Sequence, residues 1–412
     1  MEVVYTHCCG LDVHKNTVVA CIIVPGPDGK LRRETQTFGT TTNEIVRLAE
    51  WLNANGVTHV AMESSGSYWK PIWNILEPLF NLVLANARDV KAVPGRKTDV
   101  KDAEWLADLF RHGLLKGSFV PNREQRELRE LTRYRTSLIE ERSAEVNRLQ
   151  KVLEGANIKL ASVATDITGV SGRQILRALI GGTTDAAAMA ELAKGRLRDK
   201  IPQLQEALRG TFGPHQRMMV AQQLAHIDFL DEAIEQLDRE VAERMRPFEE
   251  IIVRLDKITG VGRRAAEIIL AQIGTDMSRF PTQRHIASWA GMSPGNNESA
   301  GKRKSGRTRK GNSALRRILV QAAHAAGRSK NTYLGAQFRR LAARRGKKKA
   351  AVAVGHSILV IIYNLIKHGT TYSDLGGNYF DLRDRDALKR RLVNRLKNLG
   401  WKVTLEPIEE AA

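Results

Sequence analysis

Residues 3–38 read VVYTHCCGLDVHKNTVVACIIVPGPDGKLRRETQTF, and this stretch decides the fold of the first part of the chain. Apolar and β-branched residues fill 3–13 and 17–24, as in strands. The turn PGPDGK joins the second run to a third at 31–38. Because turns this short connect neighbouring strands that run in opposite directions, we predict three strands in an antiparallel meander.

From residue 43 helical and extended patterns alternate. The predicted elements are a helix over 43–56, a strand over 57–63, a helical stretch over 69–80, a strand over 81–86 and a helix over 98–113. Gly56 ends the first of these helices, and the last begins with Thr98 as its N-cap and stops at Gly113. The order β-β-β-α-β-α-β-α predicts an α/β domain with a mixed sheet over residues 1–122.

The remaining sequence is predicted to be mainly helical. Apolar residues recur at helical spacing in 123–155 and 216–246, which predicts two long amphipathic helices in a region spanning 123–250. They form either an antiparallel hairpin or an oligomerisation coiled coil. A basic, mainly helical domain follows over 251–412, and its last elements are a helix over 387–400 and a strand over 401–407.

Charge points to a polyanionic partner. The 412 residues include 65 Lys and Arg against 45 Asp and Glu, a formal charge of +20. Nucleic acid is the usual partner of such a chain, and a membrane-surface binder or a merely soluble basic protein is the alternative.

Cysteine usage and hydropathy point to the cytoplasm. Cys8 and Cys9 are adjacent and Cys21 is close by, which suits neither a zinc site nor a disulfide framework, so we expect buried, reduced thiols. The N-terminus lacks a signal-peptide pattern. The most apolar window, 350–366, is short for a membrane span and predicts a buried helix.

Four acids lie where predicted elements end or begin. Asp12 ends the first strand, Glu63 ends the fourth, and Asp99 and Asp102 lie three residues apart on one helix face. Each alone has an ordinary explanation as a turn, loop or cap residue. Together they predict a carboxylate cluster at one end of the sheet, which suits magnesium-dependent phosphoryl transfer.

Two glycine-rich, basic segments are candidate phosphate contacts. In DKITGVGRRAAEIILAQI (256–273) the turn at Gly260 and Gly262 resembles half of a helix-hairpin-helix, with Arg263 and Arg264 beside it; an ordinary glycine turn between packed helices is equally compatible. Residues 289–317 predict a loop. Its candidate nucleic-acid contacts are Lys302, Arg303, Lys304, Arg307, Arg309 and Lys310.

A serine in this loop is either a nucleophile toward a phosphodiester or part of a phosphate-binding loop. From the residues alone the candidates cannot be ranked. They are Ser293, Ser299, Ser305 and Ser313.

Four motifs together resemble a known family. GLDVHK (10–15), AMESSGSYW (61–69), KTDVKDAEWLADLFRHG (97–113) and AGMSPGNNESAGKRKSGRTRKGN (290–312) are similar to motifs of the DEDD transposases of the insertion sequence one-ten family, also called bridge-RNA-guided recombinases. The resemblance covers nearly the whole chain. It implies an RNase H-like (RuvC-like) domain over 1–122, a coiled-coil region over 123–250 and a transposase domain with a serine loop over 251–412.

The resemblance also implies the site. Its four acids fall on Asp12, Glu63, Asp99 and Asp102, which would bind Mg²⁺, and two such ions are expected. Its nucleophile belongs to a P-x-x-x-x-S loop, which gives Ser299. Many relatives have Ser-Ser-Gly there, and this chain has Ser299-Ala300-Gly301. Ser305 stays a minor alternative.

The resulting hypothesis is a transposase that cleaves and rejoins donor and target DNA through a covalent phosphoserine, guided by a noncoding RNA. The resemblance further implies a homo-oligomer, dimer or tetramer, in the cytoplasm with the nucleoid of a bacterium or archaeon. Two alternatives are a structure-selective, Holliday-junction-type nuclease that uses water, and a non-catalytic nucleic-acid-binding protein.

Overall fold

The computed structural model describes residues 2–26, 29–64, 66–86, 102–295, 297–308 and 310–406. The predicted features at Thr98, Asp99 and Arg309 lie outside these residues. The chain divides into two compact units, Met1–Arg123 and Glu124–Ala412. The three-domain division at residues 122 and 250 stays a prediction.

The first unit is built on a five-stranded mixed sheet. Its strands are β1 (Cys8–Val13), β2 (Thr17–Pro25), β3 (Leu31–Gly39), β4 (His59–Glu63) and β5 (Asn81–Ala85). Their order is β3-β2-β1-β4-β5. The meander β1-β2-β3 is antiparallel, as predicted, while β4 and β5 run parallel to β1. This mixed sheet confirms the predicted α/β class and is consistent with an RNase H-like fold.

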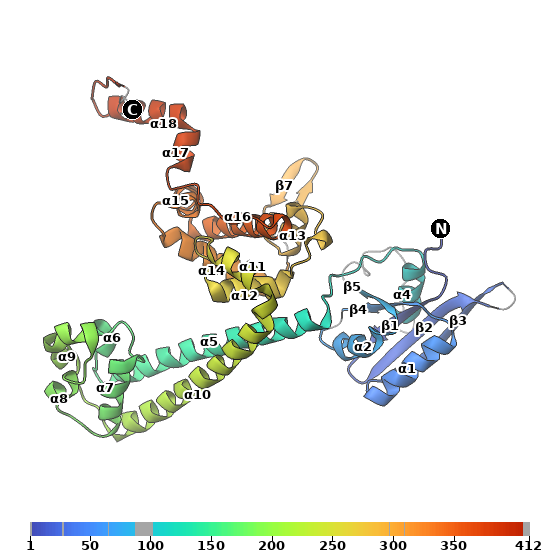
Figure 1. Ribbon diagram of the computed structural model, residues 1–412, viewed down its shortest axis with the longest axis horizontal. Helices are drawn as coiled ribbons and strands as arrows, with labels where there is room; N and C mark the ends of the chain where they lie inside the picture. The colour runs from blue at the N-terminus through green and yellow to red at the C-terminus, as the bar shows by residue number, and fades with distance from the viewer. Residues whose placement is uncertain are drawn as a thin grey trace. The chain divides into compact units, whose positions relative to one another are not determined.

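Helices cover both faces of this sheet (Figure 1). They are α1 (Thr42–Ala54), α2 (Trp69–Leu76) and α4 (Asp102–Arg111). Side chains alternate between the faces of a strand, so Cys9 and Leu11 of β1 pack with α1 and α2, while Cys8 packs with α4. The apolar run of β2 is buried on both faces for the same reason.

The predicted first strand is shorter than expected at its start. Residues 3–7 are not part of β1, because the backbone N–H groups of Val4 and Tyr5 donate to the carbonyl of Arg111 at 2.9 and 3.1 Å. These two N–H groups bind a carbonyl at the C-terminal end of α4, and the last carbonyls of a helix have no partner within the helix. Local sequence cannot show this competition, because Arg111 is a hundred residues away.

Two long helices dominate the middle of the chain, α5 (Arg123–Gly155) and α10 (Pro214–Met245). They pair with each other in antiparallel fashion: Arg244 contacts Glu127 at 2.7 Å near one end, and Arg142 pairs with Asp231 further along. Leu138, Leu230 and Ile234 form the apolar seam between them. Of the two predicted arrangements, the structure shows the intramolecular hairpin.

A cluster of short helices caps the distal end of this hairpin (Figure 1). They are α6 (Leu160–Val163), α7 (Val170–Ile180), α8 (Ala186–Ala190), the 3₁₀ helix η2 (Gly195–Lys200) and α9 (Ile201–Ala207). Leu149 and Leu153 of α5 and Val220 and Ile227 of α10 are buried among them. The cluster therefore has its own core.

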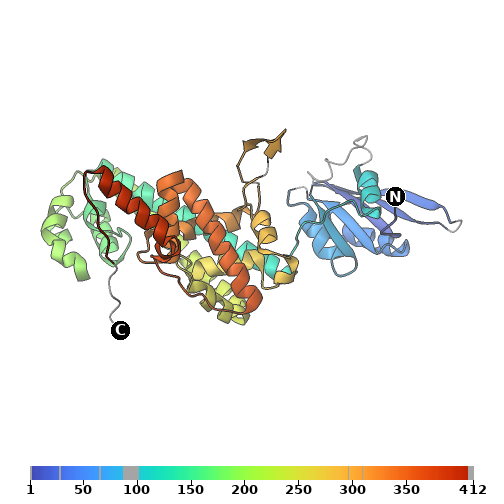
Figure 2. The same cartoon turned by 90° about the horizontal axis from the view of Figure 1, so that it is seen from above.

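The described residues of the C-terminal part of the second unit are helical, as predicted, apart from one β-hairpin that projects from the helices (Figure 2). Its elements are η3 (Arg246–Phe248), α11 (Glu249–Asp256), α12 (Arg263–Ile273), η4 (Met277–Arg279), α13 (Gln283–Trp289), β6 (Asn297–Ser299), β7 (Lys302–Ser305), α14 (Ser313–Arg328), α15 (Tyr333–Arg345), α16 (Lys347–His368), α17 (Tyr379–Arg383) and α18 (Arg385–Asn398). Of these, α14, α15 and α16 pack on one another, and α12 packs on α14.

Two C-terminal predictions have different outcomes. The apolar window 350–366 forms most of α16, which in the described part of the chain is the helix long and apolar enough to cross a membrane. Half of its most apolar window is buried in the unit, including Val354, Ile358 and Ile362. The predicted strand over 401–407 is wrong: residues 401–406 have no regular structure, because no strand among the described residues pairs with them.

A buried ion-pair network joins the base of the long hairpin to α12. The guanidinium of Arg135, whose residue is 1% exposed, donates to Asp238 of α10 at 2.9 Å and to Glu267 of α12 at 2.8 Å. A buried charge is tolerated only where opposite charges and hydrogen bonds replace water. This network therefore fixes α5, α10 and α12 relative to one another.

Candidate active site and nucleic-acid interface

Asp12 and Glu63 lie side by side at one end of the sheet. The parallel register pairs Leu11 of β1 with Met62 of β4, so the two acids follow at adjacent positions. Leu11 and Met62 both belong to the core beneath α1 and α2. Since alternate side chains point to opposite faces, Asp12 and Glu63 are on the face that α4 covers.

Asp102 comes to the same end of the sheet. Helix α4 runs antiparallel to β1, because the thiol of Cys8 donates to the carbonyl of Ala107 while Gly10 approaches Ala103. A Cβ on Gly10 would lie 2.5 Å from the Ala103 carbonyl oxygen, so the glycine permits this close packing. Asp102 is the first residue of α4 and therefore lies toward the end of β1 that carries Asp12.

The donor set suits a hard divalent cation, since all three side chains offer carboxylate oxygens. Asp12 is half-buried and its Oδ2 lies 3.2 Å from His14 Nε2. Within the described residues, which exclude Asp99, no three His, Cys, Asp or Glu side chains are grouped closely enough to hold one ion. The fold brings Asp12, Glu63 and Asp102 toward one end of the sheet without grouping them closely enough to hold one ion, and Asp99 lies outside the described residues.

The predicted serine loop is a β-hairpin rather than an irregular loop. Ser299 ends β6 and pairs with Lys302 at the start of β7, which leaves Ala300 and Gly301 as a two-residue turn. Both have positive φ, 52° and 72°, as the tight turns of two-residue hairpins require. For alanine this conformation costs about 1–2 kcal/mol, so strain is stored one residue after Ser299.

The other serines have structural surroundings. The Ser305 hydroxyl accepts a hydrogen bond from the Arg307 backbone N–H at 3.1 Å, a local turn contact. Ser313 is the first residue of α14, directly after the N-cap Asn312. Ser293 precedes the hairpin and is half-buried.

The base of the hairpin is held tightly. A Cβ on Gly311 would lie 2.3 Å from the Gly291 nitrogen, so the two chain segments that bracket the hairpin touch through their backbones. Next to it, Asn312 Nδ2 donates to Gln272 Oε1 at 3.0 Å, and Arg133 of α5 donates to the same oxygen at 2.7 Å. Sequence reasoning missed these positioning residues, because nothing local marks side-chain contacts between residues 40 and 139 positions apart.

The glycine turn at 256–273 packs inward. A Cβ on Gly260 would lie 2.3 Å from the Ala322 carbonyl oxygen of α14, whereas Gly262 faces open space. Arg263 forms two hydrogen bonds with Glu249, at 2.6 and 2.7 Å, and Arg264 pairs with Asp238. These contacts match the ordinary packing turn that the sequence left open, and phosphate binding by this turn stays a prediction.

Basic residues extend well beyond the predicted loop. Between Glu298 and Asp374 the sequence contains 18 Lys and Arg residues and no acid. Lys302, Arg307 and Lys310 are exposed; the side chains of Arg303 and Lys304 are not among those described. The end of α15 and the start of α16 add five exposed cations that sequence reasoning missed, although the run RRGKKK marks them: Arg344, Arg345, Lys347, Lys348 and Lys349.

Two family models match the chain. One for DEDD transposases of IS110, described as "Transposase", matches residues 9–158, which include Asp12, Glu63 and Asp102. The other, described as "Transposase IS116/IS110/IS902 family", matches residues 253–339, which include the β6–β7 hairpin.

Individual proteins are also similar. A protein of Pseudomonas aeruginosa named "Probable family 20 transposase" is 26% identical over 323 residues, covering 76% of this chain and 85% of its own length. A protein of Coxiella burnetii named "Transposase for insertion sequence element IS1111A" is 23% identical over 286 residues, covering 68% of this chain and 69% of its own.

Proposed function

The chain belongs to the IS110 family of transposases, and we propose that it recombines DNA through a covalent bond between Ser299 and a DNA phosphate. Family membership makes it an enzyme that cleaves and rejoins DNA. The observation that carries the proposal is the hairpin, which presents Ser299 beside a strained turn on a segment rich in cations.

The proposed reaction is two transesterifications. The Ser299 hydroxyl oxygen attacks the scissile phosphorus, a P–O bond to a deoxyribose oxygen breaks, and the hydroxyl proton passes to solvent while the departing oxygen is protonated. A hydroxyl at another DNA end then attacks the phosphoserine and restores the serine. Phosphodiester bonds are exchanged one for one, so no nucleotide hydrolysis is required.

The acids and cations have separate roles in this proposal. A DEDD transposase domain depends on divalent metal ions, and we assign Mg²⁺ to Asp12, Glu63, Asp99 and Asp102, with two ions expected. The ions would stabilise charge on the phosphate oxygens. Lys302, Arg303, Lys304, Arg307, Arg309 and Lys310 hold the DNA backbone near Ser299; Gly260, Gly262, Arg263 and Arg264 are a second proposed contact.

Specificity and assembly complete the proposal. DNA is the substrate, and a noncoding guide RNA supplies sequence recognition by base pairing. The active form is a homo-oligomer, a dimer or tetramer, in the cytoplasm with the nucleoid. The +20 charge supports nucleic-acid binding in general.

Trapping the covalent intermediate tests the proposal. The full chain is expressed with the native flanking DNA of its element, given Mg²⁺, denatured, and examined for DNA-linked protein. We expect an adduct in the wild type and in Ser305→Ala, and none in Ser299→Ala. Loss of the adduct only in Ser305→Ala would identify Ser305, not Ser299, as the nucleophile. Nicked DNA without any adduct would instead indicate a hydrolytic nuclease.

A further inference from the structure

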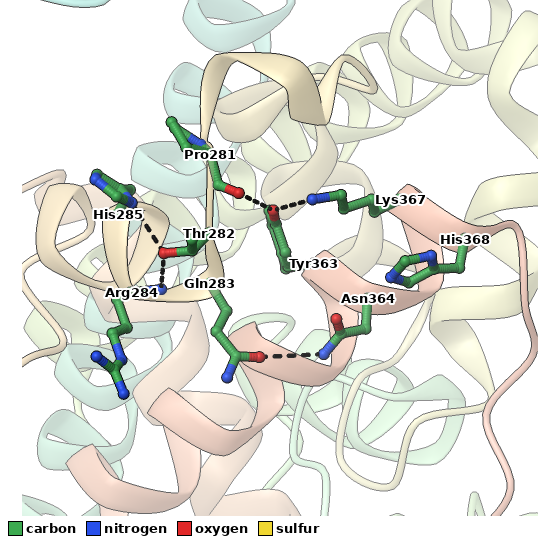
Figure 3. Close-up of a pocket in the computed structure, with 9 residues that line it drawn as sticks. All are labelled: Pro281, Thr282, Gln283, Arg284, His285, Tyr363, Asn364, Lys367 and His368. Carbon is green, nitrogen blue, oxygen red and sulfur yellow. Dashed lines mark hydrogen bonds between the residues drawn. The ribbon is translucent and has the colours of Figure 1, made fainter.

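A solvent-exposed pocket lies between α13 and the C-terminal end of α16. It has a volume of about 530 Å³ and is lined by residues 281–285 and by Tyr363, Asn364, Lys367 and His368 (Figure 3). None of these nine described residues is in the serine hairpin or among the four acids. The two lining segments are about eighty residues apart in sequence, so only the fold brings them together.

The lining is cationic. Arg284 and His285 come from α13, and Lys367 and His368 come from the last turn of α16. The nine lining residues include no Asp or Glu. Among the described contacts, Arg284, Lys367 and His368 form no ion pair with an acid, although many exposed arginines of this chain do, Arg263 among them.

The nearest acids in sequence are already engaged. Asp276 accepts hydrogen bonds from Ser278 and Arg279, and Asp374 accepts them from the backbone of Tyr333 and Gly376. Among the described contacts, no acid therefore pairs with Arg284, Lys367 or His368. An anion would complement these groups.

The neutral groups of the pocket indicate which anion. The Tyr363 hydroxyl donates to the Phe280 carbonyl at 2.9 Å and accepts from Lys367 Nζ at 3.0 Å, which leaves two N–H groups of that ammonium for a ligand. The Tyr363 residue is only 3% exposed, so its ring is closed to base stacking. The lining thus offers N–H donors and positive charge for phosphate oxygens.

We propose that this pocket binds a phosphate of a nucleic-acid backbone, at a contact separate from the serine hairpin. The inference rests on the proposed function, because it takes nucleic acid as the partner. An open pocket buries a single free phosphate poorly, whereas a polymer adds further contacts outside the pocket. Arg284 is near the start of α13, and the chain continues from the end of α13 into the β6–β7 hairpin. A nucleic-acid backbone bound at Arg284 would therefore contact the chain a short distance in sequence before the hairpin.

Salt-dependent binding by the full-length protein tests this site. The probes are a labelled 30-bp DNA duplex and a labelled 30-nucleotide RNA, titrated between 50 and 200 mM NaCl. For Arg284→Gln/Lys367→Gln we expect weaker binding and a smaller log–log salt slope. The decrease should be about 0.9 for each DNA phosphate that the variant no longer neutralises, or about 0.7 for single-stranded RNA. The probe that responds identifies the source of the phosphate.

The matched control is Lys151→Gln/Arg209→Gln, which removes the same charge from exposed positions elsewhere in the second unit. The proposed phosphate site would be overturned if the salt slope of the pocket variant changed no more than that of the control for both probes. The single variant Arg284→Gln provides the same measurement. Because the Arg284 side chain is exposed, we expect its replacement to leave the fold intact. If the wild type forms no adduct in the trapping assay, the proposed function fails. If the wild type forms the adduct but the pocket variants bind both probes with the same salt slope as the control, only this inference fails.

Discussion

Asp12 is the acid whose surroundings the structure describes best. It is half-buried at the end of β1, level with Glu63 on β4, and its carboxylate lies 3.2 Å from His14 Nε2. The register brings two carboxylates to adjacent positions at one end of the sheet, and the metal-binding role of Asp12 stays a prediction.

Asp12→Asn tests this role. The amide keeps the shape of the side chain but loses the negative charge that a cation requires, so we expect adduct formation to fall at least about a hundredfold at saturating Mg²⁺. The matched control is Asp108→Asn on α4, whose carboxylate pairs with Arg33 at 2.9 Å. Equal activity of wild type and Asp12→Asn would remove this acid from the site.

The three thiols are free and buried, as the sequence predicted. Burial raises the pKa of Cys8 from 9.0 to about 12, and it also raises the pKa of Cys9 and Cys21. A raised folded-state pKa contributes stability that is complete below pH 9 and is lost as the pH rises toward 12, because the unfolded thiol ionises first.

Thiol labelling checks this directly. In native protein at pH 8.5 we expect an aromatic disulfide reagent to label the cysteines slowly, because they are neutral and inaccessible. In urea all three should react within minutes. Rapid labelling of native protein would show that the first unit opens readily or that the thiols ionise near pH 9.

At the scale of elements, periodicity predicted the helices but not their partners. The apolar spacing of 123–155 and 216–246 fits a hairpin and a coiled coil between subunits equally well. Pairs such as Arg244 with Glu127 and Arg142 with Asp231 settle the pairing of α5 with α10 within one chain. The oligomeric state stays a prediction.

The β6–β7 hairpin depends on the backbone contact at its base. Gly311→Ala would place a Cβ 2.3 Å from the Gly291 nitrogen and force the two segments apart, so we expect adduct formation to fall at least about tenfold and stability to drop by about 1–3 kcal/mol. Gly155→Ala at the end of α5 is the control, since that Cβ meets open space. Trapping assays and urea unfolding measure the two effects, and similar behaviour of both variants would show that the base is not rigid.

At the scale of the whole molecule, the positive charge belongs to one unit. Residues 1–123 contain 14 Lys and Arg against 13 Asp and Glu, a net +1, while residues 124–412 contain 51 against 32, a net +19. The sum is the +20 of the full chain. Long-range attraction of nucleic acid therefore comes from the second unit.

Charge removal in the two units should have different effects. Lys348→Gln/Lys349→Gln removes two exposed cations at the start of α16, and we expect a DNA-binding salt slope smaller by about 1–2. Lys30→Gln/Lys116→Gln removes two exposed charges from the first unit and should leave the slope unchanged. Equal changes in both variants would mean that only total charge matters.

The sequence by itself determined the elements and their class. The apolar runs in 8–24, the helical spacing in 123–155 and 216–246, and glycine stops such as Gly56 and Gly113 are local properties, so they could be predicted from adjacent residues. The positions of Asp12, Glu63 and Asp102 at element ends, and the basic run after Ser299, were predictable for the same reason.

Only the tertiary structure decided what depends on distant residues. Residues 3–7 leave the sheet to satisfy the carbonyl of Arg111, residues 401–406 form no strand because none of the described strands pairs with them, and the serine segment forms a hairpin whose base rests on Gly291 and Gln272. The cationic pocket between α13 and α16 is of the same kind. Each outcome depends on whether a partner far away in sequence is present, and no local pattern can encode that partner.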